Sequence, residues 1–337
     1  MTAVSLERIN NMQWETRVTD MLGCKYPIIE GAYARQGSWK FAAAVAKAGC
    51  HGLITATTPG TPEKLRDSIK RCREAVEGSG GSFGVNISVG VCPEPEKYLE
   101  VCIEEKVPLE TAVYRPDELA PRIKEGGLLW MHKTARVKDA MHAESLGADA
   151  VIVVGLEGTG FKQAEQMPTM LTTLLAKRRI KVPFISAGGI GDARGFLGAL
   201  AMGADGVMMG TAFMATKEFP LSTRAKEAIV NADPFDLELR HRVIGSVDPR
   251  VYQEVLGLRD QLPQNQWLNM LERVNLKDPD WKSPPVHRTD EEEITKLRLV
   301  SLAAAVVDGV PTVKEFIDKI ICDAEALLDS YQFLKTR

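Results

Sequence analysis

The stretch VPFISAGGIGDARGFLGALAMGADGVMMGT, residues 182–211, decides the fold that this chain is expected to adopt. Its first part, VPFISA, is a short apolar run typical of a strand buried on both faces, and the run stops at Gly188. Asp192 then stands where a helix N-cap is expected, FLGALAM has helical apolar spacing, and Gly203 ends the helix. GVMM follows as a second buried strand. The stretch therefore predicts a strand–helix–strand unit of a parallel α/β protein.

Both strands of this unit end in a glycine turn, at Gly188–Gly189 and at Gly210–Thr211. Glycine lets a ligand approach the backbone closely, and free N–H groups at the start of a helix attract anions. Two neighbouring turns of this kind indicate a phosphate site, and the phosphate would belong to a ligand. The alternative is an ordinary βαβ unit in which the glycines serve only the tight turns.

The composition is that of an ordinary soluble globular protein, because 45% of the 337 residues are hydrophobic, 26% are charged and the formal net charge is −3. Such a chain lacks the basic field that draws nucleic acid or an anionic membrane. No apolar run reaches the roughly 18 residues that span a bilayer, and the polar N-terminus lacks the apolar stretch of a signal peptide. We therefore expect a cytoplasmic protein that acts on a small molecule, with neither nucleic acid nor a membrane as partner.

The cysteines and the common catalytic motifs exclude several classes of site. Six cysteines are spread along the chain without a CxxC pair or a zinc-like spacing, so we expect reduced thiols that serve packing, and no metal site. They are Cys24, Cys50, Cys72, Cys92, Cys102 and Cys322. The sequence also lacks HExxH, GxSxG and a Walker-type phosphate loop in a supporting context, so metalloprotease, α/β-hydrolase and nucleoside-triphosphatase functions have no support.

Strands and helices alternate regularly around the opening stretch. Eight short apolar runs alternate with eight helical patterns over about 200 residues, which is the size and rhythm of a (β/α)8 TIM barrel. A helix end, a glycine and a buried strand recur in AKAGCHGLI (46–54), ESLGADAVIV (144–153) and AMGADGVMM (201–209), as expected for a closed ring of similar units. A doubly wound open sheet is the alternative. The expected strands are residues 27–32, 51–56, 83–88, 108–114, 128–133, 148–155, 182–187 and 206–209.

The alternation breaks in the last third of the chain. Residues 232–293 mix prolines, charges and isolated aromatics, which predicts irregular structure that lies over another part of the protein. Residues 294–308 and 312–329 then predict two amphipathic helices. We expect residues 1–231 to form the barrel, and residues 232–337 to form a mostly helical appendage, irregular in part, that covers the active-site face.

In a barrel of this kind the reactive face lies at the carboxyl ends of the strands, and three polar residues stand there. Asn86 ends an apolar strand, where its carboxamide can bind the edge of a flat heterocycle, although asparagine also closes turns. Lys133 ends another strand, where it either stabilises negative charge on a ring or an enolate or reaches out to solvent. His132 precedes it, and adjacent strand residues point to opposite faces, so at most one of the two faces the barrel centre.

With these residues the chain resembles the nitronate monooxygenase family, formerly called 2-nitropropane dioxygenases, which includes flavin-dependent enoyl-acyl-carrier-protein reductases and certain NAD(P)H:quinone reductases. The similarity covers residues 14–213 and resumes at 299–328. Its most specific segments are YPIIEGA (26–32), AAAVAKAGCHGLI (42–54), FGVNIS (83–88), HKTARVKDAMHAESLGADAVIVVGLEGTG (132–160) and, above all, VPFISAGGIGDARGFLGALAMGADGVMMGTAFMATKE (182–218). The resemblance implies a TIM barrel that binds FMN and catalyses a redox reaction.

The resemblance also implies where FMN would lie. Its phosphate would contact the amides of residues 188–189 and 210–211, and its isoalloxazine ring would lie beside Gly31 and Ala32. Asn86 would contact the flavin, and a place for Lys133 near the pyrimidine end of the ring is our own extension. The cofactor-binding residues expected on this basis are Gly31, Ala32, Asn86, Lys133, Glu157, Gly158, Ala187, Gly188, Gly189, Met209, Gly210 and Thr211.

The chain departs from the family at the proton-handling residue. After the sixth strand the family reads E-x-G-G-H, whereas residues 157–161 of this chain read EGTGF. A phenyl ring neither accepts nor donates a proton, so the histidine chemistry of the family does not carry over to Phe161. The sequence does not select which residue replaces the histidine. The candidates are Lys133, His132, Tyr33 and Lys162.

We therefore expect an FMN-dependent oxidoreductase that oxidises alkyl nitronates with O2. The alternative within the family is an NAD(P)H-dependent reductase of a quinone or of an activated C=C bond of the enoyl thioester type, which the apolar Phe161 favours. A second alternative is a barrel that binds another phosphate ligand and does no redox chemistry. The sequence is compatible with a homodimer, and it does not determine the substrate or the choice between NADH and NADPH.

Overall fold

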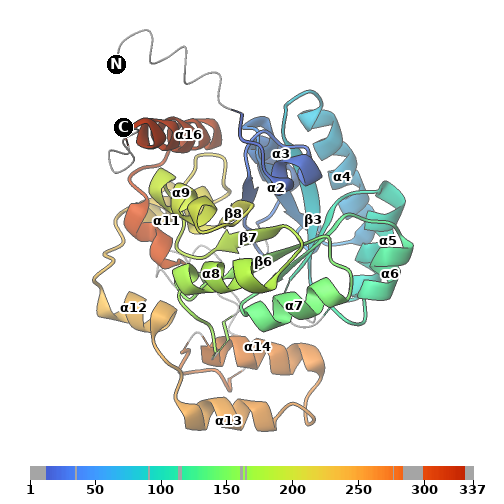
Figure 1. Cartoon of the computed structure of the whole chain (residues 1–337). Helices are drawn as coiled ribbons and strands as arrows, with labels where there is room; N and C mark the ends of the chain where they lie inside the picture. The colour runs from blue at the N-terminus through green and yellow to red at the C-terminus, as the bar shows by residue number, and fades with distance from the viewer. Residues whose placement is uncertain are drawn as a thin grey trace.

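The strands close into a barrel. The computed structural model describes residues 13–34, 36–89, 92–112, 116–159, 162–163, 165–275, 277–283 and 299–330. Eight parallel strands follow one another in chain order and β8 pairs with β1 (Figure 1), which excludes the open sheet and confirms the predicted (β/α)8 barrel. The strands are β1 (Ile28–Glu30), β2 (His51–Thr55), β3 (Ser82–Ser88), β4 (Leu109–Ala112), β5 (Trp130–Thr134), β6 (Ala150–Val154), β7 (Phe184–Ala187) and β8 (Gly206–Met209).

The helices around the barrel begin at cap residues that the sequence predicts. Ser38, Thr61 and Asp192 each accept a hydrogen bond from the backbone N–H three residues further on. Such caps satisfy N–H groups that the first turn of a helix leaves unpaired. The helices are α3 (Trp39–Lys47), α4 (Pro62–Val76), α5 (Pro95–Glu105), α6 (Ala120–Glu125), α7 (Val137–Ser145), α8 (Thr169–Arg179), α9 (Ala193–Ala201), the short α10 (Thr211–Met214) and α11 (Thr223–Val230).

The barrel has an outer and an inner apolar core, because successive residues of a strand point to opposite faces. On β1, Ile28 packs outward against the helices and Ile29 packs into the barrel interior. Val18 and Leu22 of α2 (Arg17–Leu22) belong to the inner cluster. Helix α2 therefore closes the amino end of the barrel and leaves the carboxyl end for a site.

Residues 237–275 are largely helical, which confirms the mostly helical appendage, whereas the irregular structure predicted for this segment is wrong. The prolines that suggested loops also start helices: Pro249 is the first residue of α13, where its missing N–H costs nothing. Helices α13 and α14 lie at the end of the barrel opposite α2 (Figure 1). These helices are α12 (Leu237–Ile244), α13 (Pro249–Gly257) and α14 (Gln264–Asn275). A cluster of apolar side chains joins α13 to α14, namely Val255, Trp267, Leu268, Leu271, Val274 and Trp281.

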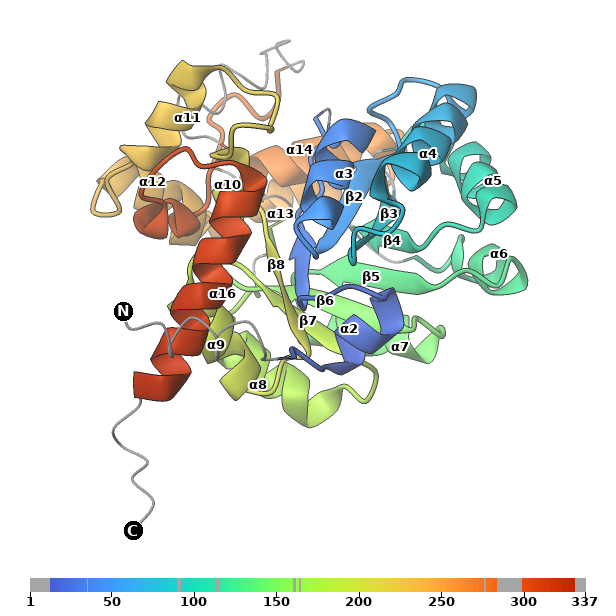
Figure 2. The same cartoon turned by 90° about the horizontal axis from the view of Figure 1, so that it is seen from above.

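The last described segment packs on the outside of the barrel. The predicted helix at 312–329 is α16 (Val313–Ser330), which lies against α9 and α3 (Figure 2). Of the helix predicted at 294–308, the first five residues lie outside the described part of the chain. The remainder contains the short 3-10 helix η1 (Leu302–Val306), so the prediction of an α-helix is wrong there. A contact with the barrel holds this segment, since the Leu302 N–H donates to the Glu157 carbonyl at 3.1 Å.

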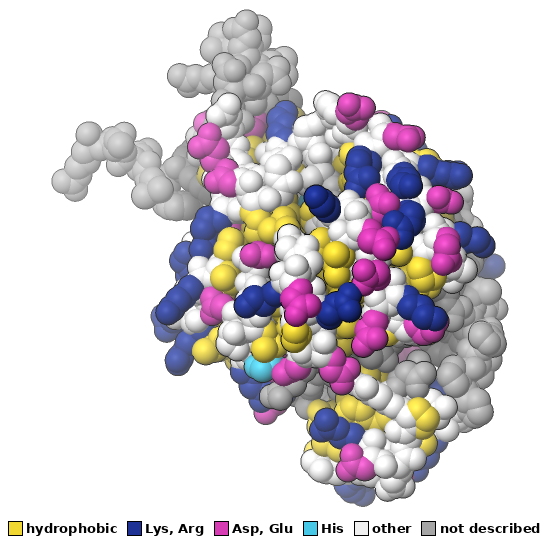
Figure 3. All heavy atoms as spheres, turned by 90° about the vertical axis from the view of Figure 1, so that its right-hand side faces the viewer, with side chains coloured by type: hydrophobic (Ala, Val, Ile, Leu, Met, Phe, Trp, Pro, Cys, Tyr) yellow, Lys and Arg dark blue, Asp and Glu magenta, His cyan; other side chains and the backbone are white. Residues whose placement is uncertain are grey.

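The outer surface carries charges of both signs. Figure 3 shows Lys and Arg interspersed with Asp and Glu over one side of the molecule. Ion pairs join neighbouring helices, for example Arg73 of α4 and Glu105 of α5 at 3.1 Å. None of the helices in the described part of the chain is long and apolar enough to cross a membrane. All six cysteines are free thiols and only Cys322 is exposed, as expected for cysteines that serve packing.

Candidate active site

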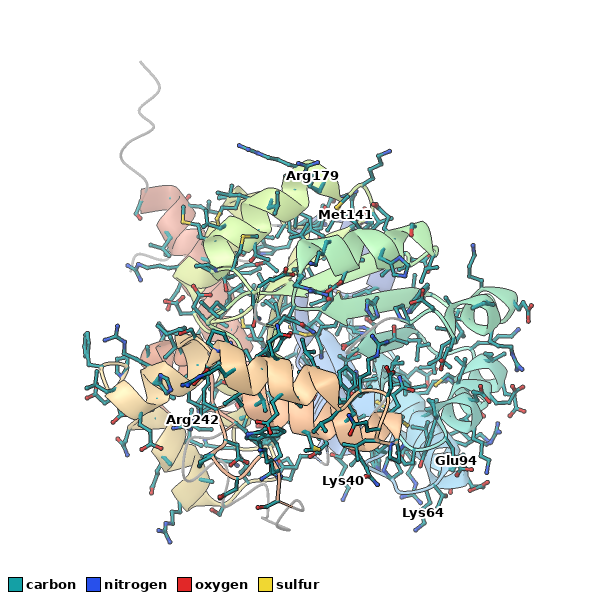
Figure 4. All side chains as sticks on the ribbon, turned by 90° about the horizontal axis from the view of Figure 1, so that it is seen from below. Lys40, Lys64, Glu94, Met141, Arg179 and Arg242 are labelled. Atoms are coloured by element: carbon teal, nitrogen blue, oxygen red, sulfur yellow. The ribbon has the colours of Figure 1, made fainter. Side chains whose placement is uncertain are left out.

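A cavity of about 950 Å³ lies over the carboxyl ends of the strands. Its floor is formed by the ends of the strands, and its roof by α13 and α14. Seen from below, these two helices cross in front of the barrel, with Met141 and Arg179 on one side and Lys40 and Lys64 on the other (Figure 4). The position and the size of the cavity are those of small-molecule sites in barrels of this type.

The glycine turns after β7 and β8 line this cavity. Gly188 and Gly189 have φ angles of 105° and 71°, in the left-handed region that favours glycine. A Cβ atom on Gly188 would lie 2.8 Å from Thr169 Oγ1, and one on Gly189 would lie 2.9 Å from Glu157 Cβ. A Cβ atom on Gly210 would meet nothing within 4 Å. We call the segments 188–189 and 210–211 the glycine cradle, because they expose bare backbone to the cavity.

Hydrogen bonds from other segments hold the Gly210–Thr211 part of the cradle. The hydroxyl of Tyr33, in the loop after β1, donates to the Gly210 carbonyl at 3.0 Å. The Thr211 hydroxyl lies 2.8 Å from the Ser301 hydroxyl and accepts from the Ser301 N–H at 3.0 Å. The side chain of Met209, which was expected to bind the cofactor, packs in the outer core and does not line the cavity.

Three side chains from neighbouring strands form a polar row on the floor of the cavity. Glu110 of β4 is fully buried, and its Oε1 lies 2.8 Å from Lys133 Nζ of β5. The same oxygen accepts from Asn86 Nδ2 of β3 at 3.1 Å. Lys133 therefore points into the barrel instead of reaching out to solvent, and Asn86 lies within a strand instead of closing a turn. The row places an ammonium and a carboxamide at fixed positions beside the cavity.

Glu110 was missed by reasoning from the sequence. The available signal was a single acidic residue in LETA, an otherwise uncharged strand, since a carboxylate in a buried strand requires a partner. The partner depends on strand register, which places Asn86 opposite Glu110 and Lys133 opposite Ala112. Sequence spacing alone does not contain that register.

His132 and Tyr33, two of the candidates for proton transfer, are engaged in bonds within the protein. His132 faces the outer core, with its Nδ1 2.8 Å from the Thr111 hydroxyl, and it does not line the cavity. Tyr33 lines the cavity, but its hydroxyl donates to Gly210. Burial and, after it, the charge of Glu30 raise the pKa of Tyr33 well above its ordinary value, so the phenol stays protonated.

The loop after β6 contains the position of the family histidine, and Gly160 and Phe161 lie outside the described residues. Glu157 Oε2 accepts from the Thr169 N–H at 2.7 Å and from the Thr169 hydroxyl at 2.6 Å, so this carboxylate caps the start of α8 and does not line the main cavity. Gly158 does line it, as do Ala32 and Ala187.

Lys162, the remaining candidate, is buried beside the cavity without lining it. Its ammonium donates to the Leu156 carbonyl. Burial, and after it the charge of Lys277, lowers the pKa of Lys162 to about 7. This lysine therefore stabilises the loop after β6 and is separated from the substrate space.

A closed βα barrel with a ligand-sized cavity over its carboxyl ends defines an enzyme of the TIM-barrel type that acts on a small molecule. The family model for nitronate monooxygenase matches residues 96–323, which is more than half of the chain. The chain therefore belongs to the nitronate monooxygenase family, and it is an oxidoreductase.

Individual relatives agree with this assignment. A Rhodococcus jostii protein named (3aS,4S,5R,7aS)-5-hydroxy-7a-methyl-1-oxo-octahydro-1H-indene-4-carboxyl-CoA dehydrogenase is 29% identical over 231 residues, 68% of this chain and 64% of that protein. The chain thus spans less than two thirds of that relative. A probable nitronate monooxygenase of Staphylococcus aureus is 28% identical over 269 residues, 66% of this chain and 74% of that protein. The structure of FabK from Thermotoga maritima superposes with a TM-score of 0.72 at 28% identity, covering 95% of this chain and 99% of that one.

Replacing Lys133 tests the polar row. Lys133→Met leaves the Glu110 carboxylate buried without its counter-charge, so we expect the free energy of unfolding to fall by about 3 kcal/mol. Adding Glu110→Gln should recover part of this loss, because the amide carries no charge. Denaturant unfolding of both single variants and the double variant measures the effect. An equal loss in Lys133→Met and in the double variant would contradict a buried ion pair.

Lys162 makes stability depend on pH. Its pKa is about 7 in the folded chain and its ordinary value is 10.5, so the unfolded chain binds more protons between these values. Stability therefore rises with pH across this window. We expect the free energy of unfolding of the wild type, relative to Lys162→Met, to increase from pH 7 to pH 10. The matched control is Lys64→Met on exposed α4 surface, which should show no such trend. If the difference in the free energy of unfolding between the wild type and Lys162→Met did not change with pH, this would contradict the lowered pKa of Lys162.

Proposed function

We propose that the cavity binds FMN, with its phosphate on the backbone of the glycine cradle. The observation that carries this proposal is that both turns of the cradle line one cavity at the ends of β7 and β8, where barrels of this type bind phosphate. The bare backbone of Gly188–Gly189 and the open space at Gly210 fit an anionic group that must approach N–H groups closely.

The remainder of the cavity fits the flat ring of the cofactor. Gly31 and Ala32 form the wall after β1, and the polar row forms part of the floor. Asn86 and Lys133 would hold the polar edge of the ring, and Lys133 would stabilise negative charge on it, because Glu110 fixes both side chains. The bound flavin would supply the two-electron chemistry. The protein supplies binding, orientation and a cavity covered by α13 and α14.

We propose that the substrate oxidised is an alkyl nitronate, with O2 as the oxidant. A nitronate is already an anion, so its oxidation requires no base at the family's histidine position. This agrees with a cavity in which several ionisable side chains are engaged within the protein. Tyr33 donates to Gly210, Lys133 pairs with Glu110, and Arg136 pairs with Asp139 at 2.6 Å.

A second candidate is the NAD(P)H-dependent reduction of a quinone or of an activated C=C bond. The observation that favours it is the apolar roof, where Leu256, Trp267, Leu268 and Leu271 line the same cavity as the strand ends. Such a surface suits a larger hydrophobic substrate. The CoA dehydrogenase named among the relatives is consistent with that class. The domain boundary at residue 231, the cytoplasmic location and the homodimer remain predictions.

The absorbance of the purified protein tests both candidates. We expect a yellow protein from which FMN can be extracted, and whose absorbance bleaches when ethyl nitronate is added under anaerobic conditions. Rapid bleaching by NADH or NADPH, without bleaching by the nitronate, would favour the reductase. A protein that is colourless, and stays colourless after FMN is added, would overturn the flavin proposal and favour a barrel for another phosphate ligand.

Enlarging Gly210 tests the position of the phosphate. The backbone at Gly210 has φ −107°, which other residues adopt, so Gly210→Leu should fold while its side chain fills the cavity. We expect FMN retention to fall at least about tenfold, measured as flavin per protein after gel filtration. The control is Gly257→Leu in α13, where a Cβ atom also meets nothing within 4 Å and the residue does not line the cavity. Undiminished flavin in Gly210→Leu would show that the phosphate lies elsewhere.

A further inference from the structure

The roof of the cavity contains a carboxyl group that the proposed function has not used. Glu272 lies on α14, one helical turn after Leu268. The side chains of Leu268, Leu271 and Glu272 all line the cavity. The Glu272 side chain is half-buried. Among the described residues, no hydrogen-bond donor and no cation is paired with its carboxylate. A carboxylate among apolar side chains, facing a substrate-sized space, is available to a substrate.

The basic side chains named below, on the floor and beside α14, are bound to other groups. On the floor, Lys133 pairs with Glu110 and Arg136 with Asp139. On the elements next to α14, Arg259 lies over the Trp267 ring, Arg273 pairs with Asp278, Lys277 donates to the Arg242 carbonyl, and Lys162 donates to the Leu156 carbonyl. Burial alone raises the pKa of Glu272, to about 7. A carboxyl with that pKa is a suitable base near neutral pH, because a large fraction is ionised and still basic.

Residues of α14 and described residues of the loop after β6 line the same cavity. Thr159 and Gln163, which flank the undescribed residues 160–161, line the same cavity as Glu272. Glu272 therefore enters from the roof a cavity that Thr159 and Gln163 also line.

We propose that Glu272 is the general base that removes the α-proton from a neutral nitroalkane, so that the enzyme generates its own nitronate. In this step the Cα–H bond breaks, the proton goes to a carboxylate oxygen of Glu272, and the electron pair of the bond moves onto the nitro group. The proton later passes to water. No oxidant is consumed until the nitronate is oxidised. This inference rests on the proposed function, since it supplies the anion that the redox reaction consumes.

The test compares two substrates in the holoenzyme. Glu272→Gln should lower the oxidation of nitroethane by about 100-fold, because general-base catalysis typically contributes at least that factor. It should lower the oxidation of ethyl nitronate far less, because that substrate has no α-proton to lose to Glu272. A second readout needs no redox chemistry: under anaerobic conditions in D2O, the wild type should exchange the α-hydrogens of nitroethane above the buffer rate, measured by NMR, and Glu272→Gln should not. Flavin content and thermal stability are measured in every sample.

Two further measurements separate a base from a structural residue. In the wild type, the rate with nitroethane should rise with pH and level off above about 7, and this rise should disappear in Glu272→Gln. Glu272→Asp keeps a carboxylate and should retain part of the exchange, which also keeps the test valid if the amide variant does not fold. The control is Glu227→Gln on exposed α11, which should behave as the wild type.

Each alternative outcome is decisive. If Glu272→Gln lost the same fraction of activity with nitroethane and with ethyl nitronate, the residue would be structural. If Glu272→Gln still exchanged the α-hydrogens of nitroethane at the wild-type rate, another group would remove the proton. Either result overturns the proposal. A wild type that oxidises ethyl nitronate but neither oxidises nor exchanges nitroethane also overturns it, and leaves the proposed function intact. A wild type that oxidises neither compound overturns the proposed function, and this inference with it.

Discussion

The pairing of β1 with β8 is the constraint on which the rest of the structure depends. It places Ile29 beside Met208 and Glu30 beside Met209, and it brings the two ends of the barrel sequence together. The approach is so close that a Cβ atom on Gly31 would lie 2.9 Å from Gly210 Cα. Because the ring is closed, the carboxyl ends of β1 and of β3–β8 line one cavity, and the glycine cradle becomes a wall of that cavity instead of an exposed turn.

Closure also creates the dry interior in which the polar row lies. A carboxylate removed from water is costly unless an opposite charge and hydrogen bonds compensate it, and Glu110 receives both from Lys133 and Asn86. Helix α2 closes the opposite end with Val18 and Leu22, so the interior below the row is apolar. One oxygen of Glu110, Oε1, thus holds both Asn86 and Lys133 in place, and such fixed polar groups suit the binding of a flat, polar ring.

The roof of the cavity has an apolar core of its own. Helices α13 and α14 are held together by their own apolar cluster, around Trp267 and Trp281, which is separate from the two cores of the barrel. Side chains that face the cavity from α14 can therefore differ without disturbing the cradle or the polar row. In the function proposed above, the barrel would retain the cofactor, whereas the roof would select the substrate and, through Glu272, its protonation.

By itself, the sequence determined the barrel, most helix starts and the two glycine turns, because these depend on local spacing and on residues with restricted backbone or capping chemistry. It also showed that at most one of His132 and Lys133 faces the barrel centre. Only the tertiary structure decided which one faces the cavity, how Glu110 is paired, and which helices of the predicted appendage line the site. The physical reason is that strand register and the packing of separate segments depend on contacts between residues far apart in the chain, which no local pattern encodes.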